Sequence, residues 1–340
     1  MLITSDFFAQ NKALFEGSNR TTTFVILEEL FRRNYEVNMP YWPNRIISFT
    51  DDKGRTRMTN GVMNWRTPAM TRFFSGNKHI TSLIAAEQKL PLLDTELYES
   101  TQQAARFWDQ HKGEVILKSV SGAGGTGVWT EFASKEEYLE KAQREVINQR
   151  LLLQQKSYAL MDLRILYVGD KMVAAAIRRP GYITGDGAAT VAELLKRENE
   201  SRRKINETHH STMVLALLPP DKVERLFGVK PDMIPADGQR IQVSLANIAG
   251  GGLAEDVTDT LHADFLEAGQ RMVQALQTPV LAVDFLCDDA TKSFADNKES
   301  VLFLETNSSP GIDLHHYPHA GEGRNVASAY IDYILDFNEN

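Results

Sequence analysis

The sequence predicts a mixed α/β fold of the α+β kind, in which amphipathic helices alternate with short strands and hairpins. Apolar residues recur at helical spacing in Thr22–Arg33 and His262–Leu276. Short apolar runs bounded by turn residues, such as Val280–Cys287, indicate strands. A glycine-rich segment, Ser121–Gly127, lies between two further strands. Because several strands are joined by short turns, antiparallel sheets covered by helices are the expected arrangement.

Composition places the chain among ordinary globular proteins. Of its 340 residues, 42% are hydrophobic and 24% are charged, which is typical of a chain with ample core. The net charge of −8 argues against nucleic acid as a partner, because the phosphate backbone requires a basic surface. The single cysteine, Cys287, excludes an intrachain disulfide and a cysteine-based zinc site.

The sequence also bears on location. Met1–Asn19 lacks a basic head followed by an apolar core, so no signal peptide is expected. No apolar run approaches the roughly 20 residues needed to cross a bilayer. We therefore predict a cytoplasmic protein with no membrane partner.

The first segment predicts a compact α/β unit. Thr22–Arg33 is expected to be a helix, and Arg45–Phe49 and Thr56–Thr59 are expected to form a hairpin around the turn Asp51–Gly54. The next helix, Ser75–Lys89, has Lys78 in its first turn, where a cation opposes the helix dipole. Lys78 either binds an anion at this position or is an exposed surface lysine.

The glycine-rich segment follows Val115–Leu117 and Lys118, and precedes Val128–Thr130. Glycines let backbone N–H groups surround phosphate oxygens, and a neighbouring lysine adds charge. The order of residues matches neither a P-loop nor a dinucleotide-binding fingerprint, and the glycines join two strands. The segment is therefore either a flap over phosphates or a plain hairpin loop.

The middle of the chain predicts a helix at Ser134–Asn148 with a capping box, and a strand at Leu151–Leu153. Asp162–Val168 and Met172–Ile177 predict a hairpin, in which Arg164 should have an anionic partner because it lies within an apolar strand. A helix is expected over Val191–Asn199. Residues 204–239 form a polar insertion to which the sequence assigns no function, followed by Asn247 and the glycine-rich Gly250–Gly252.

Two acid-bearing strands follow the helix His262–Leu276. Val280–Cys287 carries Asp284, and the strand starting at Val301 ends in Glu305 and Asn307. Residues two apart on a strand share a face, so Glu305 and Asn307 converge, and pairing of the strands would add Asp284. Such oxygen ligands suit Mg²⁺ held between carboxylates and phosphates. The alternative is that Asp284 is an edge or bulge residue. A closing helix is expected over Gly321–Leu335.

The order of these motifs resembles the ATP-grasp superfamily of carboxylate–amine ligases. Within it, the chain is most similar to the ATP-grasp part of cyanophycin synthetase and of the bifunctional glutathione-synthesising enzyme. The matching stretches include GNKHITSLIAAEQKLP, ILKSVSGAGGTGV, DLRILYVGDKMVAAAIRRP, ANIAGGGLAEDVTD and FLETNSSPG. They run from Lys78 to Arg324.

The resemblance implies a role for each matching residue. The residues implied to bind ATP are Lys78, Lys118, Gly122, Gly124, Gly125, Gly127, Gln155 (beside the adenine, where the family often has Glu) and Asp162 (at the ribose). Asp284, Glu305 and Asn307 would hold Mg²⁺, with Mn²⁺ as an alternative. Arg164 and Arg178 would stabilise the acyl phosphate and the tetrahedral intermediate. Asn247, Ser309 and Gly311 would lie on the substrate side.

The resemblance also implies an ATP-grasp fold with an N-terminal α/β domain (1–77), a helix and central lid (78–155), and a C-terminal antiparallel-sheet domain (156–340). It implies an ATP-dependent ligase that joins an amino-acid or peptide carboxylate to an amine, with homo-oligomers common among relatives. A kinase-like phosphotransferase and a nucleotide-binding regulatory module are the alternatives. One departure is that Val243–Leu245 stands where the relatives carry an arginine. His315 and His316 follow Gly311, either as structural loop histidines or on the substrate side.

Overall fold

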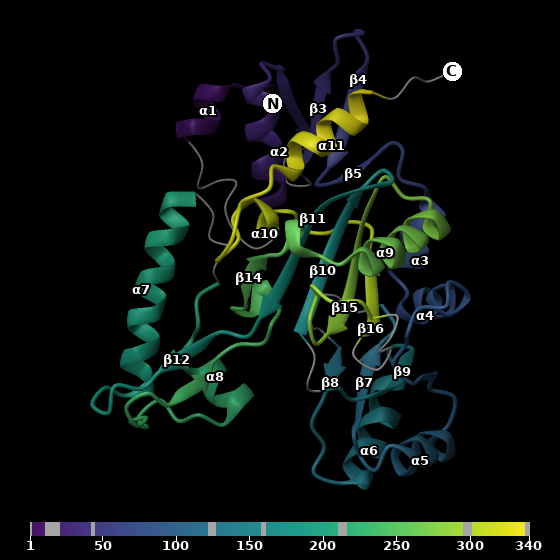
Figure 1. Cartoon of the computed structure of the whole chain (residues 1–340), viewed down its shortest axis with the longest axis vertical. Coiled ribbons are helices and arrows are strands. Elements are labelled where there is room, and N and C mark those ends of the chain that lie inside the picture. Colours follow the sequence, from purple (N-terminus) through teal and green to yellow (C-terminus); the bar gives the residue numbers. More distant parts are fainter. Residues whose placement is uncertain are drawn as a thin grey trace. The chain divides into compact units, whose positions relative to one another are not determined.

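The computed structural model describes residues 2–10, 21–41, 45–121, 127–157, 161–209, 216–294 and 301–336. Contacts divide the chain into two compact units, and Figure 1 labels their helices and strands. The first unit comprises Met1–Arg66, Lys171–Asp259 and Ser309–Asn340, and the second comprises Thr67–Asp170 and Thr260–Ser308. The division into 1–77, 78–155 and 156–340 stays a prediction.

An antiparallel sheet backed by two helices makes up one part of the first unit. Thr59 and Tyr330 join sheet and helix through a hydroxyl–hydroxyl hydrogen bond of 2.7 Å. The predicted hairpin is confirmed, with Ile47 opposite Thr59. The closing helix begins at Val326 rather than Gly321, because Asn325 caps it by accepting from the Ser328 N–H. The elements, in sheet order and then helices, are β1 (Leu2–Ile3), β2 (Val37–Tyr41), β3 (Ile46–Thr50), β4 (Thr56–Asn60), β5 (Met63–Asn64), α1 (Ser5–Gln10), α2 (Thr21–Arg32) and α11 (Val326–Leu335).

The remainder of the first unit contains the polar insertion. The helix predicted to end at Asn199 continues to His209, because Arg202 and Asn206 are buried rather than solvated. This helix and α8 share an apolar core that includes Leu195, Leu218 and Val243, so the described part of the insertion is folded. The elements are β11 (Lys171–Arg179) paired with β14 (Leu253–Asp256), β12 (Tyr182–Thr184) paired with β13 (Arg240–Gln242), α7 (Val191–His209), α8 (Pro220–Phe227), the short helix η3 (Ile248–Gly250) and α10 (Asp313–His316).

The second unit holds two sheets. One has the strand order β6-β9-β7-β8 and packs against α5 and α6 around Phe107, Leu117 and Tyr138. The predicted N-cap is confirmed, since Ser134 accepts from the Glu137 N–H, but the Glu137 carboxylate accepts from the Ala133 N–H, one residue before the cap, and not from Ser134 as a capping box requires. The elements are β6 (Thr95–Leu97), α5 (Thr101–Gln110), β7 (Val115–Ser119), β8 (Val128–Trp129), α6 (Lys135–Val146) and β9 (Leu151–Gln155).

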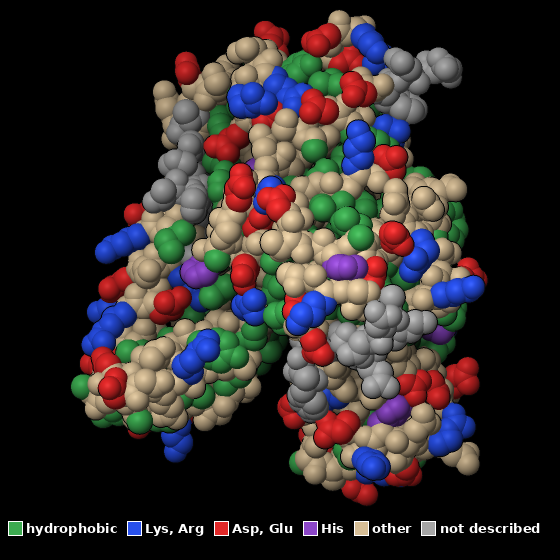
Figure 2. Space-filling view, viewed as in Figure 1, with side chains coloured by type: hydrophobic (Ala, Val, Ile, Leu, Met, Phe, Trp, Pro, Cys, Tyr) green, Lys and Arg blue, Asp and Glu red, His purple; other side chains and the backbone are tan. Residues whose placement is uncertain are grey.

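The other sheet of the second unit carries the acid-bearing strands. Its antiparallel order is β10 (Met161–Val168), β15 (Val280–Cys287) and β16 (Val301–Asn307). Helix α9 (Ala263–Leu276) packs on it, with α3 (Ala69–Ser75) and α4 (Lys78–Glu87) also in contact. No helix in the described ranges has both the length and the apolar character to cross a membrane. On the face in Figure 2, the described Lys and Arg side chains are interspersed with Asp and Glu.

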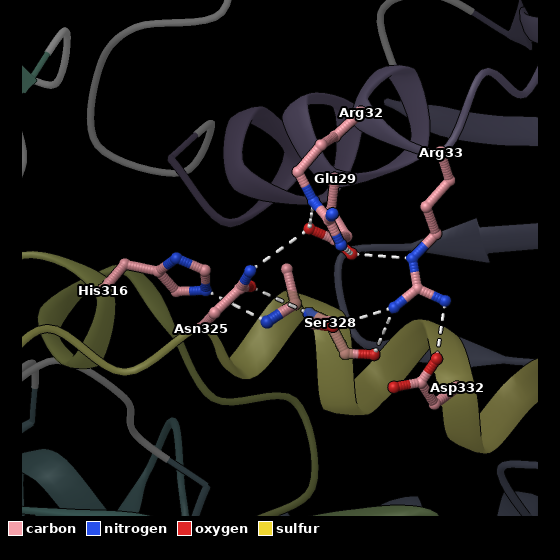
Figure 3. A network of polar contacts seen from close by, with 8 residues as sticks. Glu29, Arg32, Arg33, His316, Asn325, Ser328 and Asp332 are labelled. Carbon is pink, nitrogen blue, oxygen red and sulfur yellow. Dashed lines mark hydrogen bonds and ion pairs between the residues drawn. The ribbon is translucent and has the colours of Figure 1, made fainter.

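A polar network ties α2 to α11 in the first unit (Figure 3). Glu29 of α2 accepts from Arg32, Arg33 and Asn325. Burial alone would raise the pKa of Glu29, but these hydrogen bonds lower it to about 2. His316 accepts the Ala327 N–H at 3.0 Å through Nε2, near the start of α11. This hydrogen bond agrees with the interpretation of His316 as a structural residue.

This contact predicts an acid-sensitive step in stability. Burial lowers the pKa of His316 from 6.5 to about 4, opposed by the nearby Glu29 carboxylate. Between these pH values the unfolded chain binds more protons, so stability falls as the pH drops from about 6.5 to about 4, by about 3 kcal/mol. We expect His316→Gln, whose amide oxygen can still accept from Ala327, to flatten this part of a stability–pH profile measured by denaturant unfolding. His319→Gln, at an exposed histidine, is the control; an unchanged slope in His316→Gln would contradict the assignment.

Candidate active site

The β10-β15-β16 sheet has one apolar and one polar face. Opposite residues on antiparallel strands point the same way, and Asp284 lies opposite both Arg164 and Glu305. On the other face, the Phe285 ring packs edge-on against Phe265 of α9 and against Phe303, at centroid distances of 5.9 and 6.1 Å. The charged side chains therefore gather on the face turned away from this core.

A β-bulge puts the acids on the correct face. Phe285 pairs with Phe303, but its neighbour Asp284 pairs with Glu305, so Leu304 is an extra residue in β16. Without it, strict alternation would place Phe303 and Glu305 on one face. The bulge instead sends Phe303 into the core and Glu305 and Asn307 to the polar face. The predicted pairing of the two acid strands is thus confirmed.

Asp284 and Arg164 form a buried bidentate ion pair. Arg164 donates from Nε to Oδ1 at 2.9 Å and from Nη2 to Oδ2 at 2.7 Å. Asp284 is fully buried and Arg164 is 9% exposed. The anionic partner predicted for Arg164 is therefore Asp284. The interpretation of Asp284 as an edge residue is wrong because β15 lies between β10 and β16, whereas its alternative, a place at a bulge, agrees with the register shift between Asp284 and Phe285.

Lys78 reaches the same face from helix α4. The Asn77 side chain caps this helix by accepting from the N–H groups of His79 and Ile80. The Lys78 N–H donates to the Val120 carbonyl at 2.9 Å, which ties the helix start to the strand leading into the glycine-rich loop. Its Nζ lies 3.5 Å from Oε2 of Glu305. Lys78 is thus positioned beside an acid and is not a solvated surface lysine.

Lys118 is a buried cation on β7. It is 8% exposed, and burial lowers its pKa to about 8, against the attraction of Glu305 and Asp162, while repulsion by Lys78 lowers it further. A weakly solvated ammonium group next to Lys78 is an unfavourable arrangement that an anionic ligand would relieve. Lys118 is therefore suited to bind phosphate.

Three other predicted nucleotide residues, Gly127, Gln155 and Asp162, are described in the second unit. Gly127 has φ +74°, and a Cβ there would lie 2.7 Å from Ser119 Cβ. Both observations mean that this position requires glycine. Gln155 is exposed at the end of β9, and Asp162 lies two residues before Arg164 on the polar face. Gly122, Gly124 and Gly125 fall outside the described residues.

The predicted site residues of the first unit differ in burial and in the elements that carry them. Arg178 is buried on β11 opposite Ala254. Asn247 caps η3, its side chain accepting from the Gly250 N–H at 3.1 Å. Ser309 and Gly311 are exposed. Val243, in the segment that departs from the relatives, is buried in the α7–α8 core.

The polar face carries oxygen side chains of the kind that a hard divalent cation binds, and both Asp284 oxygens there accept from Arg164. Two carboxylates, Asp284 and Glu305, lie opposite one another, and the Asn307 amide follows on the same face. In the described ranges, no group of three His, Cys, Asp or Glu side chains is placed to hold a metal, and the predicted set has only two members of that kind. The Cys287 thiol is buried, which raises its pKa to about 12, so it is not suited to act as a nucleophile.

Comparison with known proteins agrees with this geometry. Residues 75–192 match the RimK-like ATP-grasp domain model. The structure superposes on a bifunctional glutathione synthetase from Pasteurella multocida with a TM-score of 0.67 and 19% identity, covering 98% of this chain and 47% of that one. The chain has an ATP-grasp fold.

The curated relatives of this ATP-grasp chain are longer proteins. A glutathione biosynthesis bifunctional protein (GshAB) from Clostridium perfringens is 22% identical over 332 residues, which are 95% of this chain and 42% of the relative. A cyanophycin synthetase from Geminocystis herdmanii is 26% identical over 270 residues, or 77% of this chain and 30% of the relative. The chain thus spans less than half the length of these relatives, and the resemblance inferred from its motifs is confirmed.

Proposed function

We propose that this ATP-grasp chain is an ATP- and Mg²⁺-dependent ligase that joins the carboxylate of an amino acid or peptide to an amine, with ADP and phosphate released. The observation that carries the proposal is the polar face of the β10-β15-β16 sheet. There Lys78, Lys118 and Arg164 lie among Asp162, Asp284 and Glu305. Such a face can accept a metal–phosphate ligand, because cations are present for the phosphates and oxygens for the metal.

The proposed reaction has two steps. A carboxylate oxygen attacks the γ-phosphorus of ATP, which forms an acyl phosphate and releases ADP. The amine nitrogen then attacks the carbonyl carbon, the bond to the phosphate oxygen breaks, and the nitrogen loses a proton. Both steps need positioning and charge stabilisation rather than a covalent bond to the protein.

Each residue has a role in this proposal. Lys78, Lys118 and the glycine-rich loop would bind the phosphates, Gln155 the adenine and Asp162 the ribose. Asp284, Glu305 and Asn307 would hold Mg²⁺, or Mn²⁺ in its place, which would neutralise charge between carboxylates and phosphates. Arg164 and Arg178 would stabilise the acyl phosphate, and Asn247, Ser309 and Gly311 would contact the substrates.

An ADP-release assay tests the proposal. Purified chain would be incubated with Mg²⁺–ATP and a matrix of amino acids and dipeptides, with mass spectrometry of every positive pair. We expect ADP release that requires both partners, and a product with their summed mass minus water. A stable phosphorylated product from one substrate alone would instead establish a phosphotransferase. Tight ATP binding without turnover on any pair would favour a regulatory module.

A further inference from the structure

Helix α7 has an unusual buried polar stripe. Asn199, Arg202 and Asn206 are 9%, 1% and 7% exposed. Their spacing of three and four residues places them on one side of the helix. Polar side chains are buried where they make specific hydrogen bonds, so this stripe should hold neighbouring segments in place.

Arg202 links three segments of the first unit. Its Nε donates to Glu198 Oε1 at 2.7 Å, and its Nη1 donates to the carbonyls of Ala216 at 2.6 Å and Gly251 at 2.9 Å. Three residues before it, Asn199 uses both ends of its amide. It donates to the Leu218 carbonyl at 3.0 Å and accepts from the Leu218 N–H at 2.8 Å. The stripe therefore holds Ala216 and Leu218, within the insertion, against α7, and Arg202 also holds the glycine-rich loop at Gly251.

The loop Ser244–Gly252 is packed tightly against this point. Gly251 has φ +98°, and a Cβ there would lie 2.4 Å from Leu218 Cδ2. The N–H groups of Gly250 and Gly252 both donate to the Asn247 carbonyl at 3.0 Å. Ser244 accepts from the Gly181 N–H at 2.6 Å, and a Cβ on Gly181 would lie 3.0 Å from Arg202 Nη2. The guanidinium and the glycines thus fit one conformation of the loop.

We propose that Arg202 is the positioning residue of this loop: by holding the Gly251 carbonyl, it keeps Asn247 in place for the amino-acid or peptide substrate. The substrate part of this inference rests on the proposed function. A guanidinium is always charged and has several donors at fixed angles, so it can bridge two carbonyls and a carboxylate at once. Among the described residues its buried Nη2 has no acceptor. At a buried site, an apolar side chain of similar volume is often at least as stabilising as a charged one. The buried charge of Arg202, with one donor unused, is therefore poor evidence of a purely stabilising role.

Hydrogen exchange of the full chain, measured by mass spectrometry, tests the positioning. We expect Arg202→Met to speed exchange of the Gly250–Gly252 amides at least about ten-fold, while exchange in β10 and β15 stays unchanged. Arg202→Lys, which keeps the charge but has fewer donors, should exchange these loop amides faster than the native chain and more slowly than Arg202→Met. The control is Arg203→Met, the exposed neighbour on α7. If Arg202→Met does not fold, Arg202→Lys carries the test; native loop exchange in whichever variant folds would overturn the inference.

A kinetic arm separates positioning from general stability. With the substrate pair found in the ADP-release assay, Arg202→Lys should raise KM for that pair at least about five-fold and leave KM for ATP within two-fold. An equal rise in both KM values would overturn the substrate part. If the native chain joins no pair, the proposed function fails, and the exchange experiment still decides whether Arg202 holds the loop.

Discussion

Glu305→Gln is expected to lower ATP turnover at least about a hundred-fold and to leave the fold intact. The carboxylate lies opposite Asp284 on the polar face and 3.5 Å from Lys78. Gln keeps the size and one oxygen but removes the charge that a divalent cation requires. The side chain is about one-third exposed (32%), so its replacement should change unfolding little. Turnover against Mg²⁺ concentration, with circular dichroism on the same samples, measures both effects.

Glu322→Gln is the matched control, since Glu322 is exposed on the first unit. It should retain native turnover. Near-normal activity of Glu305→Gln at the Mg²⁺ concentration that saturates the native chain would contradict the metal assignment.

Lys118→Met is expected to make the protein more stable and nearly unable to bind ATP. Lys118 has a pKa lowered from 10.5 to about 8, chiefly by burial. Between these pH values the unfolded chain binds more protons than the folded chain, so the free energy of unfolding rises with pH. Below about pH 8 the buried charge lowers the free energy of unfolding by its full amount, about 3 kcal/mol. Met occupies a similar volume without the charge, so the free energy of unfolding at pH 7 should rise by about 1 to 3 kcal/mol. Removing the buried cation should weaken ATP binding about a hundred-fold.

Denaturant unfolding at pH 7 and calorimetric titration with Mg²⁺–ATP measure the two effects on Lys118→Met. Lys196→Met, at an exposed lysine, should change neither. A less stable Lys118→Met with native ATP affinity would show that Lys118 is a structural residue and not a phosphate ligand.

Much of the second unit could be predicted from local sequence. Short apolar runs in Val280–Cys287 and Asp162–Val168 identified the strands. An arginine inside an apolar strand indicated an anionic partner for Arg164, but the sequence did not name that partner, which is Asp284. Ser134 identified its helix start through the capping pattern. These features depend on residues close in sequence or on the pairing of two strands, so a local sequence pattern is sufficient to predict them.

The remaining features depend on tertiary packing. The bulge at Leu304 has no local signature, because the apolar run VLFL continues into ETN without a glycine or proline that would mark it. The helix predicted to end at Asn199 continues to His209, and Asn199 and Arg202 are buried because they donate to backbone carbonyls distant in sequence, at Leu218 and Gly251. Lys78 could not be distinguished from a surface lysine until Glu305, more than two hundred residues away, was placed beside it.

The most direct test of the central claim is the fate of a carboxylate oxygen. The substrate acid would be labelled with ¹⁸O in its carboxylate, and the phosphate released with ADP would be weighed by mass spectrometry. The acyl-phosphate account predicts that each phosphate carries one ¹⁸O atom, because the carboxylate oxygen that attacks the γ-phosphorus leaves with it. Unlabelled phosphate, or label found in AMP, would contradict the account.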